Sequence, residues 1–471
     1  MIQSSLKRDA KFCSWMLFCG VTLVTLLQTF TQAQAIVTRD SHPQNLTNFN
    51  GTLYFSATTS AKGKELWKSN GTAVGTVLVK DINPGAADSY PSYLTNVNGL
   101  LYFSANTSAT GRELWKTNGT AVGTVVVKDI IPGFSDSDPE YLTNVNGTLY
   151  FVAYHPDRGR ELWKTNGTAV GTVLVKDINP GYYGSVPQNL TNVNGLLYFE
   201  AYNPATGREL WKSNGTAAGT VLVKDIFLGA PYANPYSLTN INGILYFGAS
   251  SLAYRNELWK SNGTAAGTVL VKDINPGSEH SNPSRLININ GTLYFRANHP
   301  DTGNELWKSN GTTRGTVLVK DIYPGFPSFS NSDPEHLTNV NGTLYFRAKT
   351  SATGEELWKS NGTAAGTVLV KDIYPGGSYS YPSSLSNVNG KLYFVAFNPT
   401  YGNELWKSNG TTLGTVLVKD INPGGVGYSP DNLTNVNGTL YFTVYKPIVG
   451  NELWKSNGTT AGTVLVKDIY P

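Results

Sequence analysis

The residues that recur most regularly in this chain and could take part in acid or base chemistry are carboxylates. Nine glutamates begin a Glu-Leu-Trp triplet, and nine aspartates stand in a Lys-Asp-Ile triplet. Catalysis normally needs neighbouring groups with different pKa values and different roles, whereas these carboxylates repeat in one local sequence close to a repeated lysine. We therefore expect ion pairs and turn contacts instead of a catalytic pair. The glutamates are Glu65, Glu113, Glu161, Glu209, Glu257, Glu305, Glu356, Glu404 and Glu452.

The five histidines are scattered through segments that differ along the chain, and only His155 and His299 share a His-Pro-Asp sequence. The chain has no acidic loop of the D-x-D-x-D-G type, no Gly-rich phosphate loop and no G-x-S-x-G motif. We therefore predict that the protein is not an enzyme, has no catalytic residues, and needs neither a metal nor another cofactor. The other histidines are His42, His280 and His336.

A second set of candidates consists of tyrosines and arginines that lie where the repeated units differ. Nine of the 27 tyrosines belong to a repeated Leu-Tyr-Phe triplet, and the others lie in or beside variable connections, apart from Tyr470 at the end of the chain. Tyrosine gives a broad contact surface and a hydroxyl at a small cost in conformational entropy. The two interpretations of these tyrosines are ligand recognition and simple packing of the loops. The predicted ligand-binding residues are Tyr90, Tyr93, Tyr182, Tyr183, Tyr232, Tyr236, Tyr379, Tyr381, Arg112, Arg160 and Arg208.

These residues are positioned by a repeated unit. Successive Glu-Leu-Trp triplets are 48 residues apart, except for one interval of 51 residues between Glu305 and Glu356. The Leu-Tyr-Phe triplet also occurs nine times, from Leu53 to Phe442. Nine units therefore occupy nearly all of the chain, without a linker between them.

Each unit contains four short runs with the character of β-strands and no helical periodicity. Asn-Gly pairs follow the first and third runs, and these pairs accept the positive φ angles of tight hairpin turns. A proline precedes the first run of each unit, as Pro91 does in the second unit, because proline can open a strand but cannot occupy its middle. In the second unit the four runs cover residues 93–97, 100–105, 113–117 and 124–130.

Four such strands form a small sheet that cannot bury both faces alone, so neighbouring units must stack. We predict an all-β fold, a β-propeller of nine four-stranded antiparallel blades. An eight-bladed ring with one extra unit, or an open β-repeat array, are the alternatives. The nine tryptophans of Glu-Leu-Trp are expected to fill the space between adjacent blades.

The variable segments should all lie on one face of this ring. The connections between the second and third strands, and between the fourth strand and the next unit, change freely, whereas the other two turns change little. In an antiparallel four-stranded blade the two variable connections emerge at the same end. We therefore predict a single rim that displays the differences between the units.

The N-terminal segment has the pattern of a secretory signal peptide, with basic residues, an apolar stretch from Met16 to Leu27, and Ala33-Gln34-Ala35 as a cleavage site. We expect residues 1–35 to be removed, residues 36–471 to form one propeller domain, and the protein to be secreted or held at the cell surface. Both cysteines, Cys13 and Cys19, lie in the segment that is removed. The net charge of the remaining chain, +2, gives no electrostatic reason to bind nucleic acid or an anionic membrane.

The run Glu-Leu-Trp-x-x-Asn-Gly-Thr resembles the bacterial ELWxxDGT repeat family, and the resemblance extends over all nine units. It implies a secreted or surface bacterial repeat protein, and it brings no established activity. The chain departs from the family pattern where asparagines such as Asn70 and Asn118 replace the aspartate of the family motif. That replacement removes the basis for a cation site at this turn and leaves its role in a hairpin intact.

Together these features predict a secreted, monomeric, non-enzymatic propeller without a membrane-spanning segment in the mature chain. Its expected partner is an extracellular glycan or a surface protein, bound through the variable rim. A purely structural extracellular component is the second hypothesis. A propeller hydrolase or lyase is the third, because such enzymes can draw their catalytic residues from distant blades.

Overall fold

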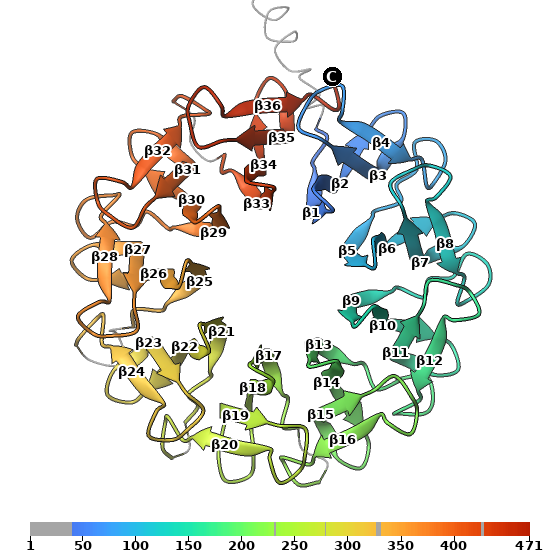
Figure 1. Cartoon of the computed structure of the whole chain (residues 1–471), viewed down its shortest axis with the longest axis horizontal. Coiled ribbons are helices and arrows are strands. Elements are labelled where there is room, and N and C mark those ends of the chain that lie inside the picture. Colours follow the sequence, from blue (N-terminus) through green and yellow to red (C-terminus); the bar gives the residue numbers. More distant parts are fainter. Residues whose placement is uncertain (1–39, 230–231, 278, 326–330, 425–427) are drawn as a thin grey trace, which may run out of the picture.

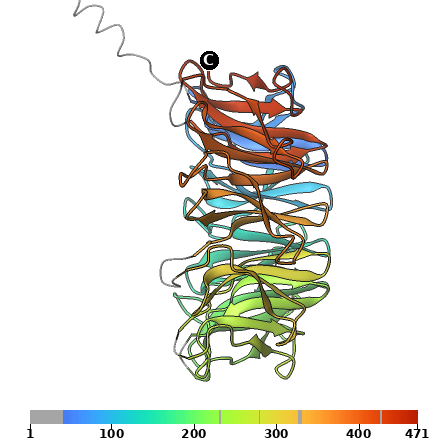
Figure 2. The same ribbon diagram turned by 90° about the vertical axis from the view of Figure 1, so that its left-hand side faces the viewer.

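The computed structural model describes residues 40–471, apart from residues 230–231, 278, 326–330 and 425–427. In this part of the chain all regular structure is β, in nine four-stranded antiparallel sheets arranged in a ring (Figure 1). Seen from the side, the ring is a flat disk (Figure 2). The predicted nine-bladed β-propeller is confirmed, and the eight-bladed and open alternatives are wrong. The predicted signal peptide, its cleavage site and both cysteines lie outside the described residues.

The innermost strand of each blade begins directly after the repeated proline, as the sequence predicts. It is an edge strand, because it pairs only with the second strand of its own blade. These nine strands surround the centre of the ring, and we call them the inner wall (Figure 1). They are β1 (Gln44–Phe49), β5 (Ser92–Val97), β9 (Glu140–Val145), β13 (Gln188–Val193), β17 (Tyr236–Ile241), β21 (Ser284–Ile289), β25 (Glu335–Val340), β29 (Ser383–Val388) and β33 (Asp431–Val436).

The second strand carries the Leu-Tyr-Phe triplet and is the most deeply buried, because neighbouring blades cover both of its faces. An Asn-Gly turn joins it to the innermost strand; in the second blade, Asn98 and Gly99 both have positive φ angles, of 50° and 78°. The second strands are β2 (Thr52–Thr59), β6 (Leu100–Thr107), β10 (Thr148–His155), β14 (Leu196–Asn203), β18 (Ile244–Ala249), β22 (Thr292–His299), β26 (Thr343–Thr350), β30 (Lys391–Asn398) and β34 (Thr439–Lys446).

The third strand carries the Glu-Leu-Trp triplet and pairs in regular register with the second strand, so that Phe103 lies opposite Trp115. Both residues therefore project from the same face of the blade. The third strands are β3 (Gly63–Ser69), β7 (Gly111–Thr117), β11 (Gly159–Thr165), β15 (Gly207–Ser213), β19 (Glu257–Ser261), β23 (Gly303–Ser309), β27 (Gly354–Ser360), β31 (Gly402–Ser408) and β35 (Gly450–Ser456).

The outermost strand is shorter than the sequence predicts, four residues instead of seven in the second blade. It ends at the lysine of Lys-Asp-Ile, where the chain turns towards the next blade. The outer strands are β4 (Val77–Lys80), β8 (Val125–Lys128), β12 (Val173–Lys176), β16 (Val221–Lys224), β20 (Val269–Lys272), β24 (Val317–Lys320), β28 (Val368–Lys371), β32 (Val416–Lys419) and β36 (Val464–Lys467).

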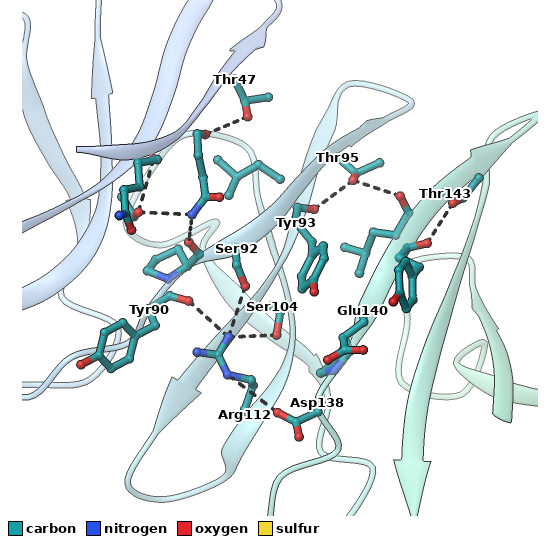
Figure 3. A pocket seen from close by; sticks show the side chains of 18 of the residues that line it. Thr47, Tyr90, Ser92, Tyr93, Thr95, Ser104, Arg112, Asp138, Glu140 and Thr143 are labelled. Atoms are coloured by element: carbon teal, nitrogen blue, oxygen red, sulfur yellow. Dashed lines mark hydrogen bonds and ion pairs between the residues drawn. The ribbon is translucent and has the colours of Figure 1, made fainter. Parts of the chain in front are cut away.

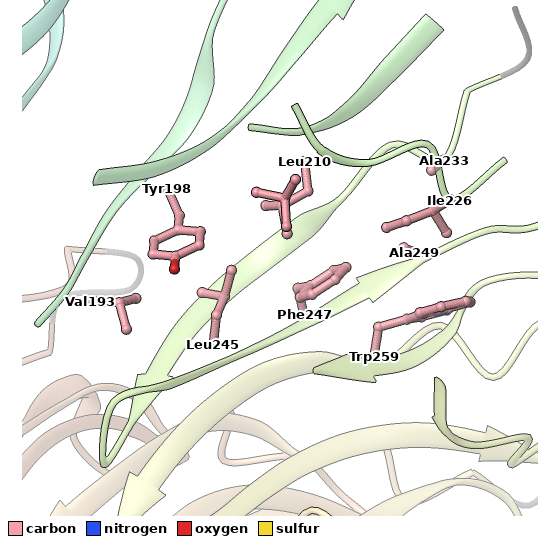
Figure 4. Packing of buried hydrophobic residues seen from close by; sticks show 10 residues of the cluster. Val193, Tyr198, Leu210, Ile226, Ala233, Leu245, Phe247, Ala249 and Trp259 are labelled. Atoms are coloured by element: carbon pink, nitrogen blue, oxygen red, sulfur yellow. The ribbon is translucent and has the colours of Figure 1, made fainter. Parts of the chain in front are cut away.

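The hydrophobic core consists of nine equivalent layers, one between each pair of blades. Figure 4 shows the layer in which Tyr198, Leu210 and Ile226 of blade four pack against Phe247 and Trp259 of blade five. The tryptophans fill these layers, as predicted. Ring closure uses the same residues, because Phe55 and Trp67 of blade one pack against Tyr441, Leu453 and Ile469 of blade nine.

The repeated lysines also join neighbouring blades, but they do so through backbone carbonyls. Lys68 Nζ donates to the Gly119 carbonyl at 2.9 Å, and Lys80 Nζ donates to the Thr124 carbonyl at 2.8 Å, both in the next blade. Lys80 also lies 5.9 Å from the centre of the Trp115 ring. These contacts neutralise no carboxylate, so the predicted ion pairs with the repeated glutamates are not formed. Among the described residues there is no helix that is long and apolar enough to cross a membrane.

Candidate functional site

The inner wall has a backbone feature that recurs while its side chains change. Each innermost strand begins with a β-bulge, seen in blade two as a shift of register between Ser92 and Thr95. The second residue of the strand lies within this bulge and has a left-handed backbone conformation, with φ between 51° and 58°. The nine residues at this position are Asn45, Tyr93, Tyr141, Asn189, Ser237, Arg285, His336, Ser384 and Asn432.

A left-handed conformation of a residue other than glycine costs about 1 kcal/mol or more, and such residues gather at functional sites. Here the strained position is also one of the most variable in the repeat. Tyr93 and Tyr141 occupy it in blades two and three, are 44% and 40% exposed, and have ring centres 6.4 Å apart. Burial, followed by the charge of Glu140, raises the pKa of Tyr93.

A large cavity lies against this part of the inner wall. It has a volume of about 930 Å³ and extends over the innermost strands of blades one, two and three to the start of β13 in blade four. Its wall includes both tyrosines, and Tyr90 lies at its border (Figure 3). Apolar surface comes from the leucine at the third position of each strand, as in Leu94 and Leu142.

Arg112 on β7 is the central polar group of the cavity (Figure 3). Its Nη1 donates to the Tyr90 carbonyl at 3.2 Å and to the hydroxyls of Ser92 and Ser104, each at 3.3 Å. Its Nε lies 3.9 Å from Asp138 Oδ1. The guanidinium is thus held by groups from two strands and two loops, and its side chain remains 23% exposed.

The cavity carries charges of both signs in equal number. Lys64 and Arg112 are basic, and Asp138 and Glu140 are acidic. Arg160 lies beside the cavity, with Nη2 3.0 Å from Asp138 Oδ2 and Nη1 3.6 Å from Glu140 Oε2. Asp138 therefore joins the arginines of blades two and three.

The predicted site residues do not come together in one place. Tyr90, Tyr93 and Arg112 line the cavity, and Arg160 lies beside it. Arg208 is engaged elsewhere, with Nη1 3.2 Å from Glu200 Oε1. Tyr236 lies over Gly248, where it is largely buried, and burial raises its pKa. In this position Tyr236 packs against its own blade.

The remaining predicted tyrosines form separate groups away from the cavity. Tyr182 and Tyr183 are 67% and 83% exposed and contact each other at 5.7 Å between ring centres. Tyr232 contacts Tyr202 at 6.1 Å. Tyr379 and Tyr381 line a second, more apolar cavity of about 500 Å³. The predicted single recognition rim thus divides into several patches and an inner-wall cavity.

The sequence interpretation did not include Tyr141, Asp138 and Glu140, which complete this cavity. The available signal was the variability of the residue before the repeated proline and of the two residues after it, which open the innermost strand. They were assigned to a rim because the position of the bulge could not be inferred from the pattern. A strand start at the ring centre places its side chains on the inner wall.

The repeated glutamates have a structural role. Glu113 has no exposed surface, and burial raises its pKa to about 7. Its Oε2 accepts one hydrogen bond from Ser137 Oγ at 2.6 Å and another from the Ile130 amide at 3.1 Å. Equivalent serines donate to the glutamate in other blades. Ser41 of blade one donates to Glu452 of blade nine, across the point where the ring closes. These carboxylates fasten the connection to the next blade, and no substrate could reach them.

No family model and no curated protein matches the chain. Solved structures match part of the chain at low similarity. One is a puromycin hydrolase S511A mutant in complex with PGG, with 14% identity, 75% of this chain and 58% of that chain covered, and a TM-score of 0.39. A second is a prolyl endopeptidase, with 12% identity, 76% of this chain and 54% of that chain covered, and a TM-score of 0.42. A third is prolyl oligopeptidase B of Galerina marginata, with 11% identity, 71% of this chain and 50% of that chain covered, and a TM-score of 0.40.

The chain thus spans between half and three fifths of the length of these proteins. The similar structures are hydrolases and peptidases, and they do not support the prediction of a non-enzymatic binding protein. At this low identity, and with TM-scores below 0.5, the likeness transfers neither an activity nor a catalytic residue to this chain. The resemblance to the ELWxxDGT family and the secreted location stay predictions.

Proposed function

We propose that the ring is the substrate-binding part of a peptide hydrolase, and that it holds an extended peptide against the inner wall of blades one to four. Of the hypotheses that the sequence left open, the propeller hydrolase is the one we keep. The single observation that carries the binding role is the cavity around Arg112. Its volume of about 930 Å³ is in the range of ligand-binding pockets, which is about 300–1,000 Å³.

The composition of the cavity suits a peptide. A peptide alternates polar backbone groups with side chains of every kind, and the cavity offers two basic and two acidic residues, tyrosine rings and leucines. Arginine can bind a carboxylate with two parallel hydrogen bonds, and tyrosine contributes contact area with little loss of entropy. A neutral polysaccharide has no charged group to pair with these four residues and little apolar surface to cover the leucines.

The edges of the innermost strands provide a further reason. β5 and β9 hydrogen-bond to a neighbouring strand on one side only, so their other edges face the ring centre. Side chains use part of these edges, since Asn144 Nδ2 donates to the Asn96 carbonyl at 3.1 Å. An extended peptide can add to such an edge through its own backbone, which is a common mode of peptide recognition.

The cavity residues bind and do not cleave in this proposal. Ser92 and Ser104 accept hydrogen bonds from Arg112, which cannot serve as a general base. Among the described residues that line the cavity there is no histidine or cysteine to activate a nucleophile. We therefore assign bond cleavage to a catalytic domain that acts together with the ring.

Binding of a pool of fluorescein-labelled octapeptides, measured by anisotropy, tests the proposal. We expect Arg112→Gln and Tyr141→Ala each to weaken binding about 10-fold, the effect of about 1.4 kcal/mol. Arg158→Gln is the matched control, because Arg158 is an exposed arginine outside the cavity that pairs with Asp177 at 2.7 Å. Equal binding by the three variants, or binding of labelled oligosaccharides in place of peptides, would contradict the proposal.

A further inference from the structure

A second group of charged residues lies on the inner wall, at the junction of blades six and seven. Arg285 on β21 and Arg296 on β22 both reach Glu335, the first residue of β25 in the next blade. Arg285 Nε lies 2.7 Å from Glu335 Oε2, and Arg296 Nη1 contacts Glu335 Oε1. Two guanidinium groups from one blade thus share one carboxylate of the next blade.

The positive charge of this group exceeds the negative charge by one. Arg347 on β26 is balanced by Glu355, whose Oε2 lies 3.3 Å from its Nε. Arg296 is satisfied on two sides, because its Nε also donates to Ser284 Oγ at 3.2 Å. Arg285 uses only its Nε within the described residues, and its side chain is 57% exposed.

The position of Arg285 also differs from that of an ordinary surface arginine. It is the left-handed residue of its bulge, with φ of 57°, so its side chain starts from the inner wall. His336 occupies the same position in blade seven, with φ of 56°. Burial, and then the charge of Arg347, lowers the pKa of His336, and Arg285 contributes in the same direction. The charge of Glu335 acts in the opposite direction and raises this pKa, so two arginines and one carboxylate act on His336.

An ion pair that only joins blades six and seven would account for Arg296, which is half-buried between Ser284 and Glu335. Such an ion pair does not account for Arg285, a second arginine that contacts the same carboxylate and keeps exposed N–H donors. Exposed ion pairs contribute little to stability, so Arg285 adds little to the interface. A planar guanidinium with free donors and one uncompensated charge fits a planar carboxylate group.

We propose that Arg285 and His336 form an anion site on the inner wall that binds a carboxylate group, such as an acidic side chain or the C-terminal end of a chain. The two Nη groups of Arg285 donate to the carboxylate, and His336 in its protonated form adds a third donor. Glu335 holds Arg285 in place through Nε. This site lies on the other side of the ring from the cavity of blades one to four (Figure 1).

Succinate is the probe, and the NMR signal of the His336 ring is the readout, at constant ionic strength set with chloride. We expect succinate to shift this signal in a saturable way and to raise the pKa of His336. Arg285→Gln should remove the effect, and Arg285→Lys should weaken it, because lysine keeps the charge without the planar fork. Arg314→Gln, an exposed arginine in an outer turn, should leave the effect unchanged.

A linear shift without saturation, or an equal effect of succinamide, which has no charge, would overturn the proposal. So would a saturable shift that persists in Arg285→Gln. Circular dichroism of each variant shows that the fold is kept. Because succinate is not a peptide, the result is independent of whether the cavity around Arg112 binds peptides.

Discussion

The layers between the blades and the start of the inner wall are built from the same nine repeats, but they differ in what is held constant. In the layers, the side chains are repeated, as Phe103 and Trp115 show in blade two. At the start of the inner wall, the left-handed backbone is repeated while the side chain changes from asparagine to tyrosine, serine, arginine or histidine. The comparison indicates that packing determines the side chains in the layers. At the start of the inner wall the repeat requires only the left-handed backbone conformation.

The largest difference in the free energy of unfolding should appear when one residue is replaced in each of these two regions of blade two. Trp115→Ala is expected to cost about 3–5 kcal/mol in the free energy of unfolding, because Trp115 is 7% exposed and fills the layer next to blade one. Tyr93→Asn should change it by less than about 0.5 kcal/mol, since asparagine tolerates the left-handed conformation. Unfolding in guanidinium chloride, followed by tryptophan fluorescence and circular dichroism, gives both values. Similar losses in the two variants would remove the distinction between the regions.

A smaller effect is expected where the connection between blades is fastened. Ser137→Ala removes the hydroxyl that donates to Glu113 at 2.6 Å. The loss of a hydrogen bond to a buried charged group costs about 1.5–3 kcal/mol, and it should be largest at a pH at which Glu113 is ionised. Ser135→Ala in the same connection is the matched control, because the Ser135 side chain is exposed. If both variants unfold at the same denaturant concentration, the serine does not fasten the connection.

In two blades the sequence itself lacks the serine that donates to the repeated glutamate. The residue two positions before the repeated proline is a serine in seven of the nine cases, but it is Ala233 in the connection after Glu209 and Tyr428 in the connection after Glu404. The pKa of Glu209 is raised to about 8, compared with about 7 for Glu113, with burial as the main cause in both. Glu404 Oε2 is buried without a partner among the described residues.

Ala233→Ser should therefore stabilise the ring by about 1 kcal/mol, mainly at alkaline pH. The folded-state pKa of Glu209 lies above its unfolded value, so its contribution is complete below pH 4.5 and is lost as the pH rises through 8. A serine hydroxyl favours the ionised form, lowers this pKa and reduces the loss. Thermal unfolding of both proteins at pH 5 and pH 9 measures the difference. A gain that is equal at the two pH values would contradict the assignment.

The sequence was sufficient for the fold because its signals agree with one another. The repeat spacing, the Asn-Gly turns and the proline before each innermost strand all specify one four-stranded blade, and each tryptophan needs a neighbour to cover it. The site was less accessible, because the pattern marks Tyr93 and Tyr141 as variable without showing that a bulge turns the strand start towards the ring centre. The partner of Glu113 was missed for a similar reason: Ser137 lies in a variable connection, and only the fold brings the two residues together.

The smallest effect is expected for a variable residue outside the inner wall. Tyr183 is 83% exposed and contacts Tyr182, so Tyr183→Ala should change the free energy of unfolding by less than about 0.5 kcal/mol. It should also leave the affinity for the labelled octapeptides unchanged, whereas Tyr141→Ala weakens it. Both variants remove one tyrosine from a tyrosine pair. A difference between their affinities for the octapeptides therefore reports the effect of a position on the inner wall. A loss of affinity in Tyr183→Ala would extend the binding surface to the outer connections and would show that variability alone, wherever it lies, marks the residues that recognise the ligand.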